Sequence, residues 1–308
     1  GATKYAPIDD RPGRNPWDAR KGSSNTNDLR GKILRIKPES DGTYSIPDGN
    51  LFPEGMEKTR PEIYVMGTRN PFRISVDKTN GYVYWGDVGP DAGTDSAGIG
   101  PMAYDEINQA REPGYYGWPL FTGNDEAYHD YDFETGISGP KFDPEKPIND
   151  SRNNTGLREL PATAPNFIWY PYDLSEEFPL MGSGGRTAMA GPVYHTEEFS
   201  GTERPFPEYY DDKLFIYEWM RGWIIAVSMD EEGNYVDMER FMPSYEFSNP
   251  MDMEFGPSGD MYVLEYGTGW FVPNDDARLV RIEYNSGNRK PLIRVAADRT
   301  KGSVPLTV

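Results

Sequence analysis

The sequence predicts an all-β fold of the β-propeller type, with a β-sandwich as the alternative. Helix-type periodicity is nearly absent, and the 33 Gly and 28 Pro residues favour turns and long loops. Short runs rich in Val, Ile, Tyr and Phe recur between turn residues. Hairpins that follow one another, separated by irregular loops, favour the propeller over the sandwich.

Eight of these runs are expected to be strands, because each is short and is bounded by turn residues. They are residues 32–37, 62–66, 72–76, 82–85, 213–219, 223–228, 260–264 and 278–284.

Three hairpins repeat along the chain. Residues 74–87 alternate in polarity, turn at Gly81 and alternate again, and residues 253–266 do the same around Gly259. A looser copy spans residues 223–241. The Asn-Gly pair that ends at Gly81 supplies the positive φ angles of a tight hairpin turn. We therefore interpret each hairpin as part of a propeller blade.

Composition narrows the possible functions. The formal charge is 31 − 50 = −19, so nucleic acid, which is bound through Lys and Arg, is a poor partner. The acidity serves solubility or, alternatively, the binding of a hard divalent cation through oxygen ligands. The absence of cysteine excludes disulfides and thiolate chemistry. No apolar run approaches the ~20 residues of a membrane span.

The expected organisation is one propeller domain, residues 1–287, that is incomplete in this chain and lacks its N-terminal blades. Residues 121–192 form a long loop excursion within it, and such excursions are functional or mobile. A propeller that is not closed exposes a sheet edge. A second chain is one possible source of the missing strands.

Five stretches together resemble the glucose/sorbosone dehydrogenase family, which includes soluble quinone-dependent aldose dehydrogenases. Their order and spacing match that family over roughly residues 29–284. They are Leu-Arg-Gly-Lys-Ile-Leu-Arg-Ile at 29–36, Gly-Thr-Arg-Asn-Pro at 67–71, Gly-Asp-Val-Gly-Pro-Asp at 86–91, Asp-Glu-Ile-Asn at 105–108 and Gly-Tyr-Tyr-Gly-Trp-Pro at 114–119.

The resemblance implies a six-bladed quinoprotein propeller that binds pyrroloquinoline quinone and Ca²⁺ on one face and oxidises a sugar by hydride transfer to the quinone. It places Arg69 and Asn70 beside the quinone, as the catalytic and cofactor-binding pair. A guanidinium there can stabilise charge that develops on the quinone oxygens. The backbone carbonyls of Gly89 and Pro90 are the implied ligands of the quinone-bound calcium.

Two further positions follow from the same resemblance. Glu106 and Tyr116 match positions at which relatives hold a second, structural calcium. Arg221, in the stretch that matches a cofactor-binding segment of the relatives, or Arg186 could substitute for cofactor-binding cations that this chain lacks.

The chain departs from the family at the positions that complete the site. The family's catalytic His lies in an earlier blade, and neither His129 nor His195 falls at that motif. Met220 stands where quinone-binding relatives have Lys, and Asn249 and Met251 stand where they have two Arg. The loss of three charge-assisted hydrogen bonds would cost the cofactor roughly 1.5–3 kcal/mol each.

Simpler interpretations of the same residues stay open. Arg69 and Asn70, which precede a proline, could belong to an ordinary turn. Asp87 and Asp91 could be solvated loop acids, and Trp118 could pack between blades rather than contact a ligand.

The tail, residues 288–308, resembles the beginning of a polycystic-kidney-disease-type, immunoglobulin-like module. With the family resemblance, it implies an extracytoplasmic location: periplasmic, secreted or on the cell surface. Two functions follow. The first is a sugar dehydrogenase-like oxidoreductase that is incomplete as this chain alone. The second is a non-catalytic, calcium-stabilised propeller that binds glycans or proteins within a larger assembly.

Overall fold

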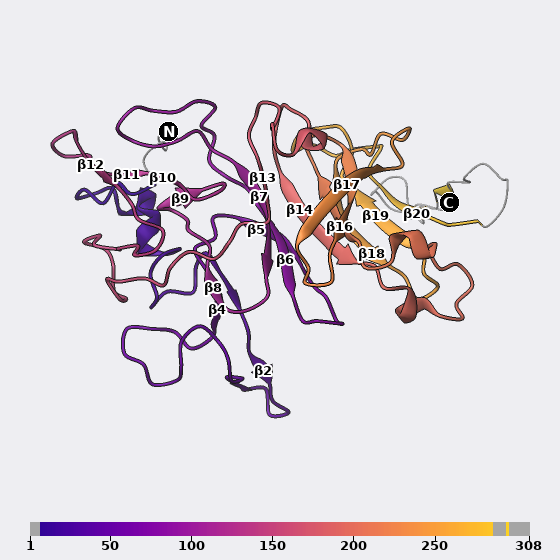
Figure 1. Ribbon diagram of the computed structural model, residues 1–308, viewed down its shortest axis with the longest axis horizontal. Coiled ribbons are helices and arrows are strands. Elements are labelled where there is room, and N and C mark those ends of the chain that lie inside the picture. Colours follow the sequence, from indigo (N-terminus) through magenta and orange to yellow (C-terminus); the bar gives the residue numbers. More distant parts are fainter. Residues whose placement is uncertain (1–6, 286–293, 296–308) are drawn as a thin grey trace. The chain divides into compact units, whose positions relative to one another are not determined.

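The computed structural model describes residues 7–285 and 294–295 (Figure 1). Within these ranges the chain forms 21 β-strands and five short 3-10 helices, and it has no α-helix. The chain divides into two compact units, and it crosses from one to the other within β5 (Pro71–Val76) and β6 (Val83–Asp87). Unit 1 is Gly1–Phe72 with Gly86–Phe178, and unit 2 is Arg73–Trp85 with Pro179–Val308.

Unit 2 contains two four-stranded antiparallel meanders, in which each strand pairs with the next one along the chain (Figure 1). This order is typical of propeller blades. The first meander is β14 (Ala188–Val193), β15 (Leu214–Glu218), β16 (Trp223–Met229) and β17 (Tyr235–Phe241). The second is β18 (Pro250–Phe255), β19 (Met261–Glu265), β20 (Arg278–Ile282) and β21 (Arg294–Val295).

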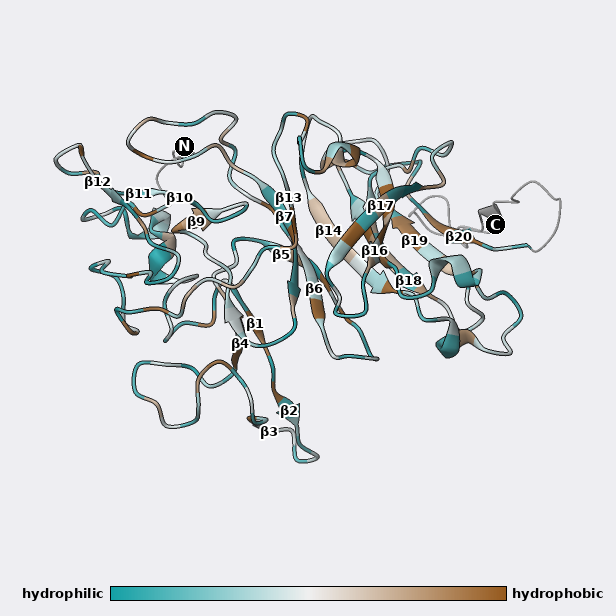
Figure 2. Cartoon of the chain, in the orientation of Figure 1, coloured by the Kyte–Doolittle hydropathy of each residue, from teal (hydrophilic) through white to brown (hydrophobic). Residues whose placement is uncertain are grey.

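Aromatic rings form the core of unit 2. The ring of Phe255 lies 4.8 Å from Tyr194, 5.3 Å from Phe206 and 5.6 Å from Phe215, measured between ring centroids. Tyr194 and Phe215 are fully buried. Hydrophobic residues run along the strands of both meanders in Figure 2. Such clusters bury large areas and gain further stability from edge-to-face contacts.

The first strand of each meander lies beside the β5 segment of unit 2. The Ser75 hydroxyl donates to the Gly191 carbonyl in β14 at 2.5 Å, and Arg73 Nε donates to the Met251 carbonyl in β18 at 3.0 Å. As a result, Asp77 and His195, which follow β5 and β14, reach the same end of the unit.

Unit 1 has shorter strands. One sheet has the order β1 (Lys32–Leu34), β4 (Ile63–Met66) and β8 (Gly114–Tyr115), and β7 (Asp105–Ala110) pairs with β13 (Ile168–Tyr170). Three two-stranded ladders complete it: β2 (Lys37–Pro38) with β3 (Tyr44–Ser45), β9 (Phe121–Thr122) with β10 (Glu126–Ala127), and β11 (His129–Asp132) with β12 (Ile137–Lys141). The 3-10 helices are η1 (Asn15–Trp17) and η2 (Ala19–Lys21) in unit 1, and η3 (Pro179–Met181), η4 (Thr196–Phe199) and η5 (Glu208–Tyr210) in unit 2.

The structure confirms that each of the eight expected runs contains a strand. It adds β7, which the sequence did not predict as a strand because it reads Asp-Glu-Ile-Asn-Gln-Ala, although all six residues are buried. The predicted excursion, 121–192, contains β9 to β13 and most of β14. Most of the predicted tail module, 288–308, lies outside the described residues, and the predicted domain limits stay a prediction. No helix in the described ranges has the length and hydropathy needed to span a membrane.

Two hairpin glycines in unit 2 give a matched stability test. Gly81 and Gly259 have φ angles of +78° and +87°. A Cβ at Gly81 would meet no atom within 4 Å, whereas at Gly259 it would lie 2.7 Å from Pro205 Cα. Gly81→Ala is expected to cost about 1–2 kcal/mol through the backbone alone. Gly259→Ala should cost roughly 1–3 kcal/mol more through overpacking. Urea unfolding of both variants checks this, and equal costs would contradict it.

Candidate functional site

The turn that carries Arg69 and Asn70 is anchored on a buried carboxylate. Asp87, at the end of β6, accepts the backbone N–H groups of Arg69 at 2.9 Å and of Asn70 at 2.5 Å. The Asp87 residue is only 6% exposed, so it is not a solvated loop acid. The Arg69 and Asn70 side chains themselves are exposed.

The Arg69 guanidinium is positioned but accessible. Its Nη1 donates to the Val88 carbonyl at 2.6 Å, and its Cζ lies 5.7 Å from the centroid of a Trp118 ring. Trp118 also makes an edge contact with the buried ring of Tyr128 at 6.2 Å. Trp118 thus packs within unit 1 and supports the guanidinium through a cation–π contact.

The Gly89-Pro90 turn is fixed by close backbone approach. Gly89 N donates to Asp105 Oδ1 at 3.0 Å, and a Cβ at this position would lie 1.9 Å from the Tyr104 carbonyl oxygen. Only glycine fits there without movement of the backbone. Asp91, by contrast, is exposed and accepts a hydrogen bond from the Tyr172 hydroxyl at 2.7 Å.

Acidic side chains are buried together behind these two turns. Asp87, Asp105 and Glu106 are 6%, 0% and 8% exposed. Burial, reinforced by the charge of Asp87, raises the pKa of Glu106 to about 8. Burial raises the pKa of Asp87 to about 6, against the opposing hydrogen bonds from the Asn70 and Arg69 amides. Asp87 and Glu106 therefore resist ionisation while their neighbours are charged.

An amide oxygen with no partner adjoins this acid cluster of Asp87, Asp105 and Glu106. Asn108 Nδ2 donates to Glu106 Oε2 at 3.0 Å, and Gly123 N donates to Glu106 Oε1 at 2.6 Å. Asn108 is fully buried, and among the described residues its Oδ1 has no hydrogen-bond donor. Buried carboxylates beside an unused amide oxygen form the kind of oxygen-rich donor set that Ca²⁺ takes, so the residues present fit this cation.

Tyr116 is packed rather than exposed. It is 7% exposed, and its hydroxyl donates to the Gln109 carbonyl at 2.8 Å. Burial raises the pKa of Tyr116 well above its usual value. The hydroxyl oxygen of a neutral, hydrogen-bonded phenol is a weaker ligand for a cation than the backbone carbonyl oxygen of the same residue.

The positions predicted to complete a cofactor site lie in unit 2. Met220 is 40% exposed, and Asn249, with φ +55°, donates from Nδ2 to the Trp219 carbonyl at 2.7 Å. Met220, Asn249 and Trp219 border a cavity of about 380 Å³. Arg186 is buried, at 7% exposure. Met220, Asn249 and Met251 are uncharged residues, so these three positions offer no cationic side chain.

Arg221 borders the same cavity, but its guanidinium is used locally. It donates to four backbone carbonyls of one loop, at distances from 2.8 to 3.2 Å. These acceptors are Met181, Gly182, Gly184 and Gly185. Binding a carboxylate through Arg221 would therefore compete with the bonds that hold this loop.

The two histidines have local partners. His129 Nδ1 lies 2.8 Å from the Gly139 carbonyl oxygen, within the β11–β12 ladder of unit 1. His195 lies between two aspartates in unit 2.

Sequence reasoning assigned Glu106 but missed Asp105 and Asn108 as members of one site. The available signal was the Asp-Glu-Ile-Asn run itself. Alternation along a strand places Glu106 and Asn108 on one face, and four polar residues among six are unusual for a buried strand.

Comparison with known proteins agrees with this picture. The family model for glucose/sorbosone dehydrogenase matches residues 13–150, a range that contains both turns and the acid cluster. Two curated proteins of Arabidopsis thaliana are similar: HIPL1 protein is 33% identical over 116 residues, and HIPL2 protein is 34% identical over 119 residues. These matches cover 33% and 34% of this chain but 15% of each relative.

A solved glucose dehydrogenase shares the fold. It is 21% identical, with a TM-score of 0.50, over 84% of this chain and 56% of that chain. The likeness confirms the predicted class, an all-β fold of the β-propeller type. The chain thus spans about half the length of this solved protein and a smaller part of the curated relatives.

The pKa of Glu106 gives a test of the cluster in cation-free protein. The folded-state pKa of Glu106, about 8, exceeds its ordinary 4.5. The contribution of the protonated carboxyl to the unfolding free energy is therefore full at low pH and is lost as the pH rises towards 8. Glu106→Gln should reduce the fall in unfolding free energy between about pH 5 and 8 by roughly 1–3 kcal/mol. Urea titrations in chelator measure it.

Glu112→Gln, at an exposed position of the same unit, is the matched control and should keep the wild-type slope. Equal slopes for Glu106→Gln and wild type would contradict the protonated, buried Glu106.

Proposed function

We propose that this chain is part of a calcium-dependent, sugar dehydrogenase-like propeller whose cation site lies at the acid cluster and the Gly89-Pro90 turn. The buried carboxylates of Asp87 and Glu106, beside the unpartnered oxygen of Asn108, carry the proposal. The match to the glucose/sorbosone dehydrogenase family model over residues 13–150 supports the sugar dehydrogenase class.

The proposed calcium ligands are oxygen atoms throughout. The Gly89 and Pro90 carbonyls serve one ion, and Glu106 with Tyr116 serves a second, structural ion. Asn108 Oδ1 is a further donor to the second ion, because it adjoins Glu106 and has no other partner. Hard cations prefer such oxygen ligands, and a bound cation would remove the cost of ionising Glu106.

Arg69 and Asn70 are the proposed contacts for a redox cofactor. Arg69 is cationic, exposed and braced by Val88 and Trp118. Pyrroloquinoline quinone, when bound, would supply the hydride-accepting centre. The cofactor-binding positions of unit 2 do not fit its carboxylates, because Met220, Asn249 and Met251 are uncharged and Arg221 is committed to backbone carbonyls.

A second candidate function is non-catalytic binding of a glycan or protein. It is favoured by uncharged Met220 and Asn249 and by the aromatic side chains beside their cavity. Trp219 and Trp270 make an edge contact at 5.0 Å, and Trp270 and Phe271 are 58% and 83% exposed. Exposed aromatic rings of this kind are typical of binding surfaces.

Under the first function the chain acts on a sugar, and under the second it binds a glycan or a protein. The proposed compartment is extracytoplasmic in both cases. A second chain that completes the propeller belongs to the same proposal.

Calcium is expected to raise the melting temperature of this chain, because an ion that binds only the native state stabilises it by mass action. At 100 times the dissociation constant, the gain is about 2.7 kcal/mol. Excess chelator should reverse it, and Glu106→Gln should reduce the shift. Differential scanning calorimetry with and without calcium checks this. An unchanged melting curve in wild type would contradict the calcium proposal.

The redox proposal is tested by adding pyrroloquinoline quinone, calcium and an aldose to the purified chain and following the reduction of a dye. If the chain turns over, Arg69→Ala should lower the rate about 100-fold, the order expected for removal of one stabilising donor. Arg158→Ala, an exposed arginine of the same unit, is the control. Calcium binding without quinone binding or dye reduction would reject the dehydrogenase and leave the binding module.

A further inference from the structure

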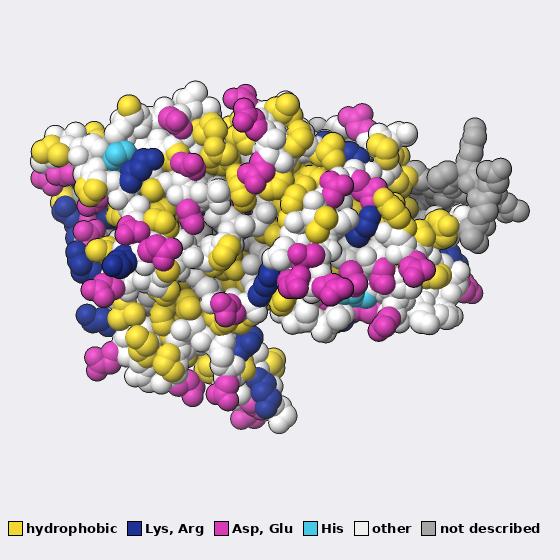
Figure 3. Space-filling view, in the orientation of Figure 1, with side chains coloured by type: hydrophobic (Ala, Val, Ile, Leu, Met, Phe, Trp, Pro, Cys, Tyr) yellow, Lys and Arg dark blue, Asp and Glu magenta, His cyan; other side chains and the backbone are white. Residues whose placement is uncertain are grey.

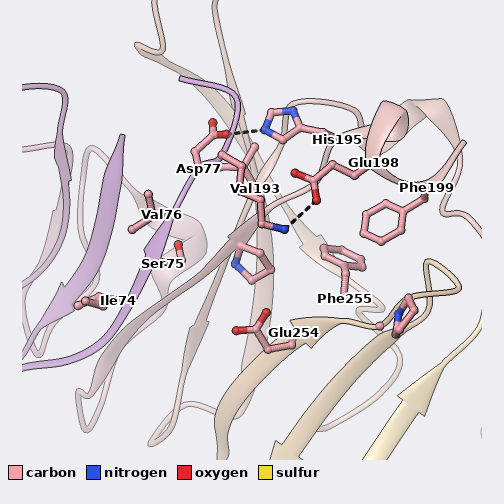
Figure 4. Close-up of a pocket in the computed structure, with 14 residues that line it drawn as sticks. Ile74, Ser75, Val76, Asp77, Val193, His195, Glu198, Phe199, Glu254 and Phe255 are labelled. Carbon is pink, nitrogen blue, oxygen red and sulfur yellow. Dashed lines mark hydrogen bonds and ion pairs between the residues drawn. The ribbon is translucent and has the colours of Figure 1, made fainter. Parts of the chain in front are cut away.

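His195 lies between two carboxylates in unit 2, away from the residues proposed above. Its Nε2 is 2.7 Å from Asp77 Oδ1, and its Nδ1 is 2.7 Å from Asp212 Oδ1. The His195 residue is 8% exposed, and the side chains of Asp77 and Asp212 are 1% and 76% exposed. Figure 4 shows the imidazole of His195 directed at Asp77 across the edge of a pocket.

The three residues come from separate segments of the fold. Asp77 follows β5 and closes the β5–β6 turn, where its carboxylate accepts the Thr79 amide at 2.8 Å and its carbonyl accepts the Gly81 amide at 2.8 Å. Asp212 lies just before β15, with φ +58°, and its amide donates to the Tyr194 carbonyl at 2.8 Å. The imidazole therefore joins the hairpin turn to the loop between β14 and β15.

Hydrogen-bond chemistry fixes the charge of this ring. Ionised carboxylates only accept hydrogen bonds, and a neutral imidazole has one donor nitrogen and one acceptor nitrogen. While Asp77 and Asp212 are both ionised, two such partners at 2.7 Å require both ring nitrogens to carry protons. Loss of one proton would place a lone pair against a carboxylate oxygen. With both nitrogens occupied, the ring also has no lone pair to offer a metal ion, although Asp211 lies close by.

We propose that His195 is a proton-operated clamp, which holds the β5–β6 turn to the β14–β15 loop when it is charged and releases the turn when it is neutral. The end of β5 and the first two residues of the turn, Asp77 and Lys78, form one wall of a cavity of about 550 Å³. Residues 254–257 and the β14–β15 segment, through Pro192, Val193, His195, Glu198 and Phe199, border it as well. Release of the turn would widen this cavity.

The other charged groups around the clamp favour the protonated state. Lys78 on the turn is paired with Glu198 of η4 at 3.2 Å, and Lys213 is paired with Glu239 at 2.7 Å. Asp211 accepts the Thr196 amide at 2.7 Å, and Glu254 of β18 also borders the cavity. Acidic side chains gather on this face of the unit in Figure 3. With both lysines paired, the remaining charge facing the ring is negative.

The direction of the pH dependence follows. Burial lowers the pKa of His195, but the hydrogen bonds and charges of Asp77 and Asp212 outweigh burial and raise it above the ordinary 6.5. A raised pKa in the folded state gives stabilisation that is complete below pH about 6.5 and is lost as the pH rises through the folded-state pKa.

The sequence has only two histidines, so proton NMR of the full chain can follow both rings, and His129→Gln assigns the spectrum. The His195 resonance is expected to titrate above pH 6.5, with both nitrogens protonated below its midpoint, and Asp77→Asn should lower that midpoint. A midpoint at or below 6.5, or a neutral ring at pH 6, would overturn the clamp.

Hydrogen exchange of residues 77–82 tests the release itself. Exchange, after correction for its intrinsic pH dependence, should speed up at least about threefold across the His195 titration in wild type and in His129→Gln. In His195→Gln it should be fast at every pH. The pH dependence in the wild-type protein is by itself sufficient to test the release, so the experiment remains decisive even if a variant fails to fold. Constant protection of this turn through the titration would refute the release.

Discussion

The arrangement of the candidate site depends on carboxyl groups buried in unit 1. The acid cluster draws backbone N–H groups towards itself, and those amides belong to the turns that carry the proposed cofactor and calcium contacts. Asp87 holds the Arg69-Asn70 turn, Asp105 holds Gly89, and Glu106 holds Gly123. The exposed guanidinium and the carbonyls of the site are thus positioned by acids that lie behind them.

Two buried acids of unit 2 are compensated by arginine. Glu265 pairs with Arg278 at 2.5 Å, and Asp260 pairs with Arg204 and Arg281, each at 2.8 Å. In the described part of unit 1, no guanidinium or ammonium group bonds the carboxylate of Asp87 or Glu106. A buried charge without such a partner is costly. A bound cation would compensate Asp87 and Glu106 in the way that arginine compensates Glu265 and Asp260.

The hairpins and their turns could be predicted from the sequence, because alternation and an Asn-Gly pair are local signals. The position of the Arg69–Pro90 region could be predicted only from motifs taken together. The burial of Asp87 and the strand β7 could not, because polar residues enter a core only where distant backbone groups satisfy them. His195 contacts Asp77, which is 118 positions away in the sequence, and Asp212, which is 17 positions away. No local sequence pattern contains both contacts.

The claim that a cation compensates the acid cluster is tested most directly by calorimetric titration of calcium into the chain near pH 7, in two buffers of different ionisation enthalpy. Because Glu106, with a pKa of about 8, is largely protonated there, binding should release about one proton per ion. In Glu106→Gln, both the binding and the release should weaken. Absence of calcium binding would contradict the account. So would calcium binding that releases no proton and that Glu106→Gln leaves unchanged.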